Sequence, residues 1–397
     1  MKQLTAFIFL CFAFTACIGQ QVSTPYAENF VNIDKKIFEL LSNGELKVFD
    51  ATRNIQVYKG LKTDFRISFL GKDNQGKLVV STEIGTLMRL NEKTLSWENI
   101  TPTHFKKCFG FEFDSSGGCF ELVVDGICDT KTGNVFTPGK ELSFSEHRFR
   151  GGPFNDWDRQ EGIKYFIDKN DNFWFTASYG EWGSDIFVFN TIAHRFVKPQ
   201  GDLMKLVRDV FESDKNVYCY GSGVRNKPFV EFGFYSRIDT VHNDTSTYKL
   251  TSHTIYSTLD NKGHDQLMSP KKSVHPDDYI GPAAFNPFDK NIYFYCAYGL
   301  YKGDPSKQLT DISHWTKVKN FKLQFHNTQP STQKKIKLTG DSIPIIDVLV
   351  DYSSDPLSEM SKMEFTKEGK LVFISRHVGL GIFDGQKITI LDSGGSR

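Results

Sequence analysis

A short pattern that recurs along the whole chain constrains the fold more than any other feature of this sequence. Each copy has an Asp-, Asn- and Gly-rich turn, an apolar run, a Gly turn, and then a strand that alternates apolar and polar residues. The clearest copies begin at Asp168, Asp73 and Phe365, and weaker ones open near Asp34, Asp114, Asp214 and Asp289. Because Asp, Asn and Gly supply the caps and positive φ angles of tight turns, each copy predicts a meander of antiparallel strands.

The number of copies predicts a β-propeller. A propeller blade has four strands in roughly 40–50 residues. Beyond residue 19, the 397-residue chain leaves about 54 residues for each of seven copies, enough for four strands and their loops. We therefore predict an all-β propeller with seven four-stranded blades, and six or eight blades as alternatives. A β-sandwich followed by a second β domain is the competing fold, which the regular spacing of Asp34, Asp73 and Asp114 disfavours.

The fourth copy resembles a known class of repeat. Its arrangement of Asp168, Asn172, Trp174 and Thr176 is similar to the propeller repeats in the periplasmic sensor regions of bacterial two-component regulators. Related repeats occur in free-standing envelope proteins. The resemblance implies a seven-bladed propeller. Because no kinase segment follows the repeats in this sequence, it does not imply a signalling role.

The first residues predict export. Lys2 provides a positive charge, and the apolar stretch from Leu4 to Cys17 is too short to span a bilayer, which takes about 20 residues. The sequence 14–17, Phe-Thr-Ala-Cys, resembles a bacterial lipoprotein signal and implies lipidation of Cys17, although Phe14 stands where that family prefers Leu. Ordinary cleavage after Gly19 is the alternative.

The propeller and signal-peptide predictions together define the domain organisation and the cellular location that we expect. Residues 1–19 form a signal peptide, and residues 20–397 form a single propeller domain. We expect the protein in the periplasm, on the outer membrane through a lipid anchor, or secreted. We expect the protein to contact a membrane only through this lipid anchor.

Net charge and cysteine content limit the kinds of partner and cofactor that we expect. The 48 basic and 47 acidic residues give a net charge of +1, so the basic stripe of a nucleic-acid-binding protein is not expected. The five cysteines beyond the signal have no Cys-x-x-Cys spacing and are expected as small core residues, with one bridge among Cys108, Cys119 and Cys128 left open. The state of Cys219 and Cys296 is also left open. We expect a monomer without metal or cofactor.

Three stretches exceed the repeat, at residues 142–162, 252–281 and 320–356, and the last has room for an additional strand pair. In a propeller, loops between blades and loops inside the central hairpin of a blade open on the same face, where binding residues collect. We therefore expect the first stretch to meet the hairpin loop of the fourth copy and to form a ligand site. Its residues are Arg148, Arg150, Asp156, Trp157, Asp158, Arg159, Tyr179, Glu181 and Trp182.

The composition of this site suits a sugar. Aromatic rings offer flat apolar faces, and the convergent polar groups offer hydrogen bonds. Arg148 or Arg150 is able to hold the carboxylate of an acidic sugar through two parallel hydrogen bonds. The alternative is that the Arg and Asp side chains only satisfy one another and stabilise the loops.

Other chemical motifs are incomplete. The segment from Asp168 to Asn172 has the first oxygen ligands of a calcium loop but lacks its Gly and Glu, so a turn is expected. The spacing of His253, His264 and His275 matches no metal motif, and no Gly-x-Ser-x-Gly or His-Glu-x-x-His occurs. The sequence thus favours a non-catalytic binding or scaffold module of the envelope, with a glycan or an envelope protein as partner. The alternative is a carbohydrate-active hydrolase or lyase that uses paired carboxylates of the predicted site.

Overall fold

Strands and turns make up the described part of the chain, which includes no α-helix and thus no helix able to span a membrane. The computed structural model describes residues 25–61, 63–101, 108–139, 163–178, 184–197, 206–214, 216–226, 232–244, 247–257, 280–296, 299–307, 314–323, 334–340, 343–350, 360–375 and 378–393.

These residues form seven four-stranded antiparallel sheets, each of which takes its strands in sequence order. The first four sheets contain β1 (Ala27–Ile33), β2 (Lys36–Leu41), β3 (Leu46–Asp50), β4 (Ile55–Leu61); β5 (Ile67–Lys72), β6 (Leu78–Thr82), β7 (Leu87–Asn91), β8 (Ser96–Asn99); β9 (Cys108–Phe113), β10 (Cys119–Val123), β11 (Gly126–Asp129), β12 (Val135–Phe136); and β13 (Tyr165–Ile167), β14 (Asn172–Ser178), β15 (Ser184–Asn190), β16 (Arg195–Val197). The other three contain β17 (Leu206–Glu212), β18 (Val217–Asn226), β19 (Phe232–Asp244), β20 (Thr247–Ser257); β21 (Ile280–Phe285), β22 (Ile292–Cys296), β23 (Gly299–Gly303), β24 (Trp315–Lys317); and β27 (Met360–Phe365), β28 (Leu371–Ser375), β29 (Gly379–Phe383), β30 (Ile388–Asp392).

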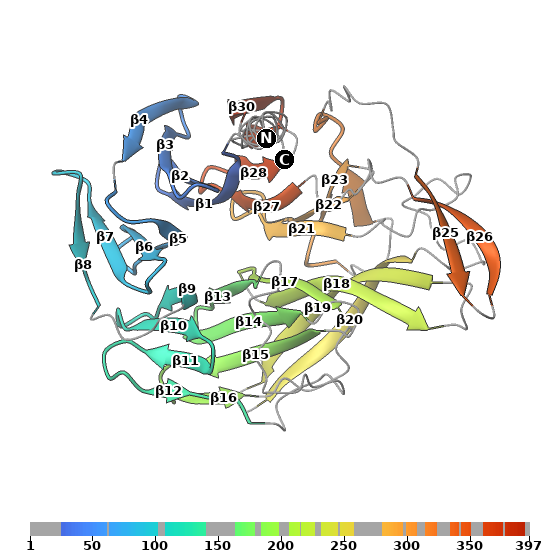
Figure 1. Cartoon of the computed structure of the whole chain (residues 1–397), viewed down its shortest axis with the longest axis horizontal. Coiled ribbons are helices and arrows are strands. Elements are labelled where there is room, and N and C mark those ends of the chain that lie inside the picture. The colour runs from blue at the N-terminus through green and yellow to red at the C-terminus, as the bar shows by residue number, and fades with distance from the viewer. Residues whose placement is uncertain are drawn as a thin grey trace, which may run out of the picture.

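The sheets are the blades of a propeller. Their first strands contact one another in order, β1 with β5, β5 with β9, β9 with β13, β13 with β17, β17 with β21 and β21 with β27. Contacts between β1 and β28 close the ring, and Figure 1 shows the sheets around a common centre. The predicted all-β propeller is therefore confirmed.

The repeated turns have the role that the sequence predicts. All seven copies place their turn between the first and second strands of a sheet. In the second blade, the Asp73 carboxylate accepts hydrogen bonds from the backbone N–H groups of Gln75 and Lys77 at 2.9 and 2.8 Å. Asp114 accepts equivalent bonds from Ser116 and Gly118 in the third blade. Because these bonds are local, the turn residues specify each hairpin directly.

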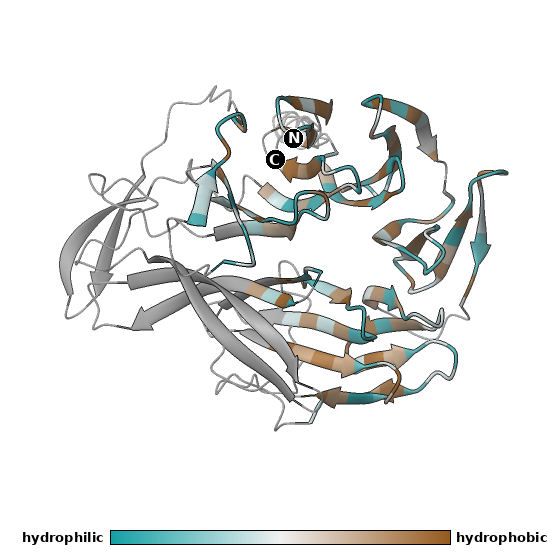
Figure 2. Cartoon of the chain, turned by 180° about the vertical axis from the view of Figure 1, so that it is seen from behind, coloured by the Kyte–Doolittle hydropathy of each residue, from teal (hydrophilic) through white to brown (hydrophobic). Residues whose placement is uncertain are grey.

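The second strand of each blade forms the core. In the second and last blades, every residue of Leu78–Thr82 and of Leu371–Ser375 is buried, as predicted for strands packed between neighbouring sheets. Figure 2 shows hydrophobic residues along the strands and hydrophilic residues at the turns. Glycines admit aromatic rings from the next blade: a Cβ on Gly71 would lie 2.6 Å from the Phe111 ring, and one on Gly110 would lie 2.2 Å from the Tyr165 ring.

The structure also describes parts of the long stretches. Residues 252–257, expected at the start of an insertion, belong instead to β20, because this strand continues its pairing with β19 to Ser257. The stretch 320–356 contains the expected strand pair, a two-stranded sheet of β25 (Lys334–Gly340) and β26 (Ile343–Val350). In Figure 1 this pair lies at the rim, outside the ring of blades. The stretch 142–162 lies outside the described residues.

Candidate functional site

The predicted ligand site is carried by the fourth blade. Its nine residues lie outside the described residues, and so does Cys17. The strands that flank the two loops are described, however, and they determine where each loop begins and ends.

Both loops leave the fourth blade from one edge of its sheet. Just before β13, Lys164 pairs with Thr176 of β14: the Thr176 N–H donates to the Lys164 carbonyl at 2.9 Å. Two residues further, β14 ends at Ser178, which pairs with Ser184 at the start of β15. The chain that enters β13 and the connection from β14 to β15 are therefore neighbours at this edge. This arrangement is the one that the predicted site requires.

A rigid aromatic core supports that edge. Phe173, Trp174 and Phe175 of β14 are fully buried, and Phe187 and Phe189 of β15 are buried beside them. The Phe175 and Phe187 rings stack with their centroids 5.1 Å apart. Because buried aromatic rings remove large apolar areas from water, they stabilise the strands from which the two loops leave.

The Asp168 turn at the other end of the blade is a structural element. One oxygen of Asp168 accepts hydrogen bonds from the N–H groups of Asn170 and Asn172, at 2.8 and 2.9 Å. The other accepts from the Trp174 indole N–H at 2.8 Å and from the Asn172 amide at 3.0 Å. Both oxygens thus serve the hairpin, as the turn prediction expects. In the described part of the chain, no three His, Cys, Asp or Glu side chains are placed to hold a metal ion.

On this opposite face, the turns of successive blades bond to one another. Between the third and fourth blades, Ser115 donates its N–H and its hydroxyl to the Asp171 carboxylate at 2.7 and 2.6 Å. Between the fourth and fifth, the Lys169 ammonium donates to the Asp214 carbonyl at 2.7 Å. Lys290 of the sixth blade pairs with the Asp214 carboxylate at 2.7 Å. The polar groups of this face therefore hold the ring together.

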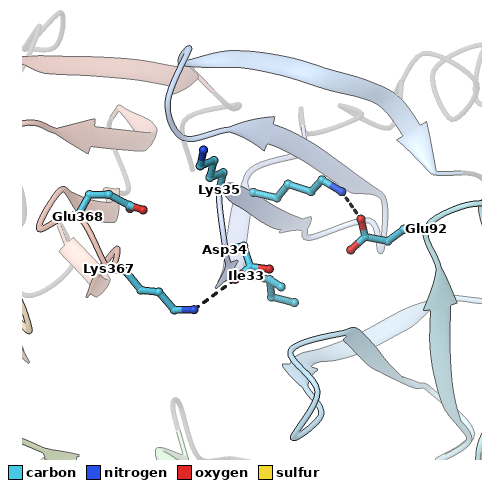
Figure 3. Close-up of a pocket in the computed structure, with 7 residues that line it drawn as sticks. Ile33, Asp34, Lys35, Glu92, Lys367 and Glu368 are labelled. Atoms are coloured by element: carbon cyan, nitrogen blue, oxygen red, sulfur yellow. Dashed lines mark hydrogen bonds and ion pairs between the residues drawn. The ribbon is translucent and has the colours of Figure 1, made fainter.

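A pocket of about 380 Å³ lies on the same face, where the last, first and second blades meet. Its lining consists of Ile33, Asp34, Lys35, Lys36, Glu92, Lys367 and Glu368. Lys36 pairs with Glu92, and Lys367 pairs with Asp34 at 3.3 Å. Figure 3 shows Asp34, Glu92 and Lys367 around the pocket. Its three ammonium groups and three carboxylates balance, and it has no aromatic face. The ion pairs of this pocket connect neighbouring blades, and its lining lacks the aromatic face of a sugar site and the excess positive charge of a phosphate site.

Sequence reasoning missed a polar cluster between the inner strands of the last and first blades. The Lys362 ammonium contacts the Asn29 side chain at 3.0 Å, the Phe30 carbonyl at 2.7 Å and the Glu364 carboxylate at 2.9 Å. Asn32 donates to the same carboxylate at 3.3 Å. The sequence feature that indicates such a cluster is a charged residue within the first strand of a blade, because the first strands surround the propeller axis.

Glu112 on β9 is a second inner-strand residue with unusual electrostatics. Burial raises the pKa of its carboxyl to about 8, although Lys72 and Lys362 act in the opposite direction. Glu364 adds to the rise through its negative charge. Glu112 therefore holds its proton more tightly than an exposed glutamate does.

Comparisons with known proteins agree on the architecture. No family model matches the chain, and no curated protein matches its sequence. The crystal structure of the Cps50 (Swd1) β-propeller domain of Myceliophteria thermophila is similar with a TM-score of 0.51 at 8% identity, over 92% of this chain and 99% of that one. The β-propeller domain of the Trilobed protease from Pyrococcus furiosus gives a TM-score of 0.48 at 12% identity, over 93% and 98%. At 8% identity, the similarity to the first of these structures establishes the propeller fold alone.

Proposed function

We propose that this chain is an exported binding module of a bacterial cell envelope whose ligand is a carbohydrate or another envelope protein. The observation that carries the proposal is the common edge from which the two predicted loops leave the fourth blade, at Lys164 and Ser178. The resemblance of this blade to sensor-propeller repeats agrees with a role in recognition. A rigid scaffold with variable loops at one edge is the usual way in which a propeller presents a binding site.

The residue types of the two loops suit a sugar or an anionic group on a protein. Tyr179, Trp182 and Trp157 provide flat apolar surfaces, on which a pyranose ring is able to stack. Arg148 and Arg150 provide planar guanidinium groups for a carboxylate. No covalent step is needed for this recognition, so the proposal is a binding function without catalysis.

Binding to a panel of envelope polysaccharides tests the site. We expect Trp182→Ala and Arg150→Ala each to weaken binding at least tenfold, because each removes a direct contact. Phe288→Ala and Arg53→Ala are matched controls, since both residues are exposed on turns of the opposite face. Unchanged binding in the first pair would refute the site. Release of oligosaccharide during incubation would instead indicate the hydrolase or lyase alternative.

Export is tested separately by mass spectrometry of the mature N-terminus after expression in a bacterium with a lipoprotein pathway. An acylated Cys17 supports an outer-membrane or periplasmic lipoprotein, and a free Gln20 supports simple secretion. Retention of Met1 in the soluble fraction would contradict both.

A further inference from the structure

The ring of blades closes without a shared sheet. In the described residues, each sheet takes only consecutive strands, so no strand of the first blade pairs with a strand of the last. The two blades nevertheless lie side by side, with β1 against β28 (Figure 1). We name this interface the seam. Because no ladder of backbone hydrogen bonds crosses it there, side chains must hold it closed.

Apolar residues form one part of the seam. Ile37 and Phe49 of the first blade pack in one buried cluster with Val372, Ile374 and Ile382 of the last blade. Such a contact contributes in proportion to the apolar area removed from water and does not depend on pH.

Ionisable groups form the other part. Besides the Lys362 and Glu364 cluster and the Lys367–Asp34 pair, three such groups lie on β2, β3 and β30. Glu39 on β2 is fully buried and lies opposite Lys47 on β3 in the strand register. The Lys47 ammonium contacts the carboxylate of Asp392, the last residue of β30, at 2.5 Å. This group of three therefore contains one cation and two acids, of which Glu39 and Lys47 belong to the first blade and Asp392 to the last.

Charge balance within this group of three requires a proton. Neither oxygen of Glu39 has a hydrogen-bond donor among the described residues, and the Asp392 carboxyl is the neighbour that acts most strongly on it. Two neighbouring carboxyl groups in a buried site are stable together only when one of them is protonated. With that proton, the three groups are neutral in sum; without it, a buried negative charge has no counterion. Glu45, which precedes β3, also raises the pKa of Glu39 through its negative charge.

We infer that the seam is a proton-dependent closure of the propeller: it stays closed while Glu39 and Asp392 share a proton, and loss of the proton to solvent separates the first and last blades. Burial, and after it the Asp392 carboxylate, raises the pKa of Glu39 to about 9. The seam is therefore closed at neutral pH and opens in mildly alkaline solution. The two blades are the moving parts, and the neighbouring blades serve as the hinge.

Distance measurements across the seam test this inference. Spin labels are placed on the full chain at Thr52→Cys and Lys387→Cys, in exposed turns of the first and last blades. We expect one narrow distance distribution at pH 7, and a second, longer one that grows above about pH 9. Glu39→Gln should keep the narrow distribution up to pH 10.5, because an amide donates to Asp392 without a titrating proton. Glu121→Gln, a buried glutamate away from the seam, should behave like the parent.

Circular dichroism at each pH distinguishes opening of the seam from unfolding. A distance that stays constant to pH 10.5 in the parent would overturn the inference, and so would equal opening in Glu39→Gln. Loss of the β signal together with the distance change would also overturn it, since the whole molecule would then unfold. If Glu39→Gln does not fold, Asp392→Asn replaces it, because the Asn amide is a permanent donor to Glu39.

Discussion

The first and third blades each bury a glutamate within the same tripeptide of their second strand, yet the two acids have different surroundings. Glu39 lies between Phe38 and Leu40, and Glu121 lies between Phe120 and Leu122. Their exposed fractions are 0% and 2%. Each faces the preceding blade, which for the first blade is the last one around the ring.

The neighbouring groups account for the difference. On the face of the third blade that Glu121 shares, alternation and register place three thiols: Cys119 two residues before it, Cys128 opposite it, and Cys108 opposite Val123. Burial alone raises the pKa of Glu121 to about 7. At the seam, burial and then a second carboxyl raise the pKa of Glu39 to about 9. The same tripeptide thus gives an acid whose pKa is raised by burial alone, or one whose pKa is raised further by a second carboxyl, according to the blade it faces.

The largest expected effect comes from replacing each acid by its neutral isostere. A glutamate whose folded pKa is raised above 4.5 contributes stability that is complete below pH 4.5 and is lost as the pH rises to the folded pKa. At pH 8, Glu39→Gln should therefore raise the free energy of unfolding by about 5 kcal/mol, and Glu121→Gln by about 3 kcal/mol. Urea unfolding at pH 5 and pH 8 measures both. A larger gain for Glu121→Gln would reverse the comparison.

A smaller effect is expected from the cation at the seam. Lys47→Met leaves the Asp392 carboxylate without its ammonium partner and should lower the free energy of unfolding at pH 7 by about 2 kcal/mol. Lys35→Met, in an exposed turn of the same blade, is the control and should change stability by less than about 0.5 kcal/mol. Equal effects of the two variants would show that the seam ion pair is not stabilising.

The smallest expected change concerns the thiols beside Glu121. Burial and then the charge of Glu121 raise the pKa of Cys128 to about 12, and burial likewise raises the pKa of Cys108 and Cys119. Because the thiolate is the reactive form, iodoacetamide at pH 8 should leave all three unmodified in the folded protein and modify them after denaturation. Glu121→Gln should not alter this result, since burial remains. Mass spectrometry after timed labelling measures the extent of modification of each cysteine. Rapid labelling of Cys119 in the folded protein would contradict the burial of this face.

The hairpins of the propeller could be read from local sequence. The turns at Asp73, Asp114 and Asp168 satisfy their own backbone N–H groups through bonds that span two to four residues. The apolar runs after them are buried on both faces, as their composition indicates. Turn chemistry and strand composition act within one hairpin, so a repeat of this kind predicts the strands, the meander and the propeller class.

The seam and the inner polar cluster could not be read in the same way, because their partners are distant in sequence. Lys47 and Asp392 are 345 positions apart, and Lys362 and Asn29 are 333 apart. Nothing in a strand such as Lys36–Leu41 indicates which blade its buried glutamate will face. Closure of the ring brings the ends of the chain together, and the low dielectric between two packed sheets then alters the acid-base behaviour of Glu39. Local residues therefore determined the repeat, and the tertiary structure decided where its charges meet.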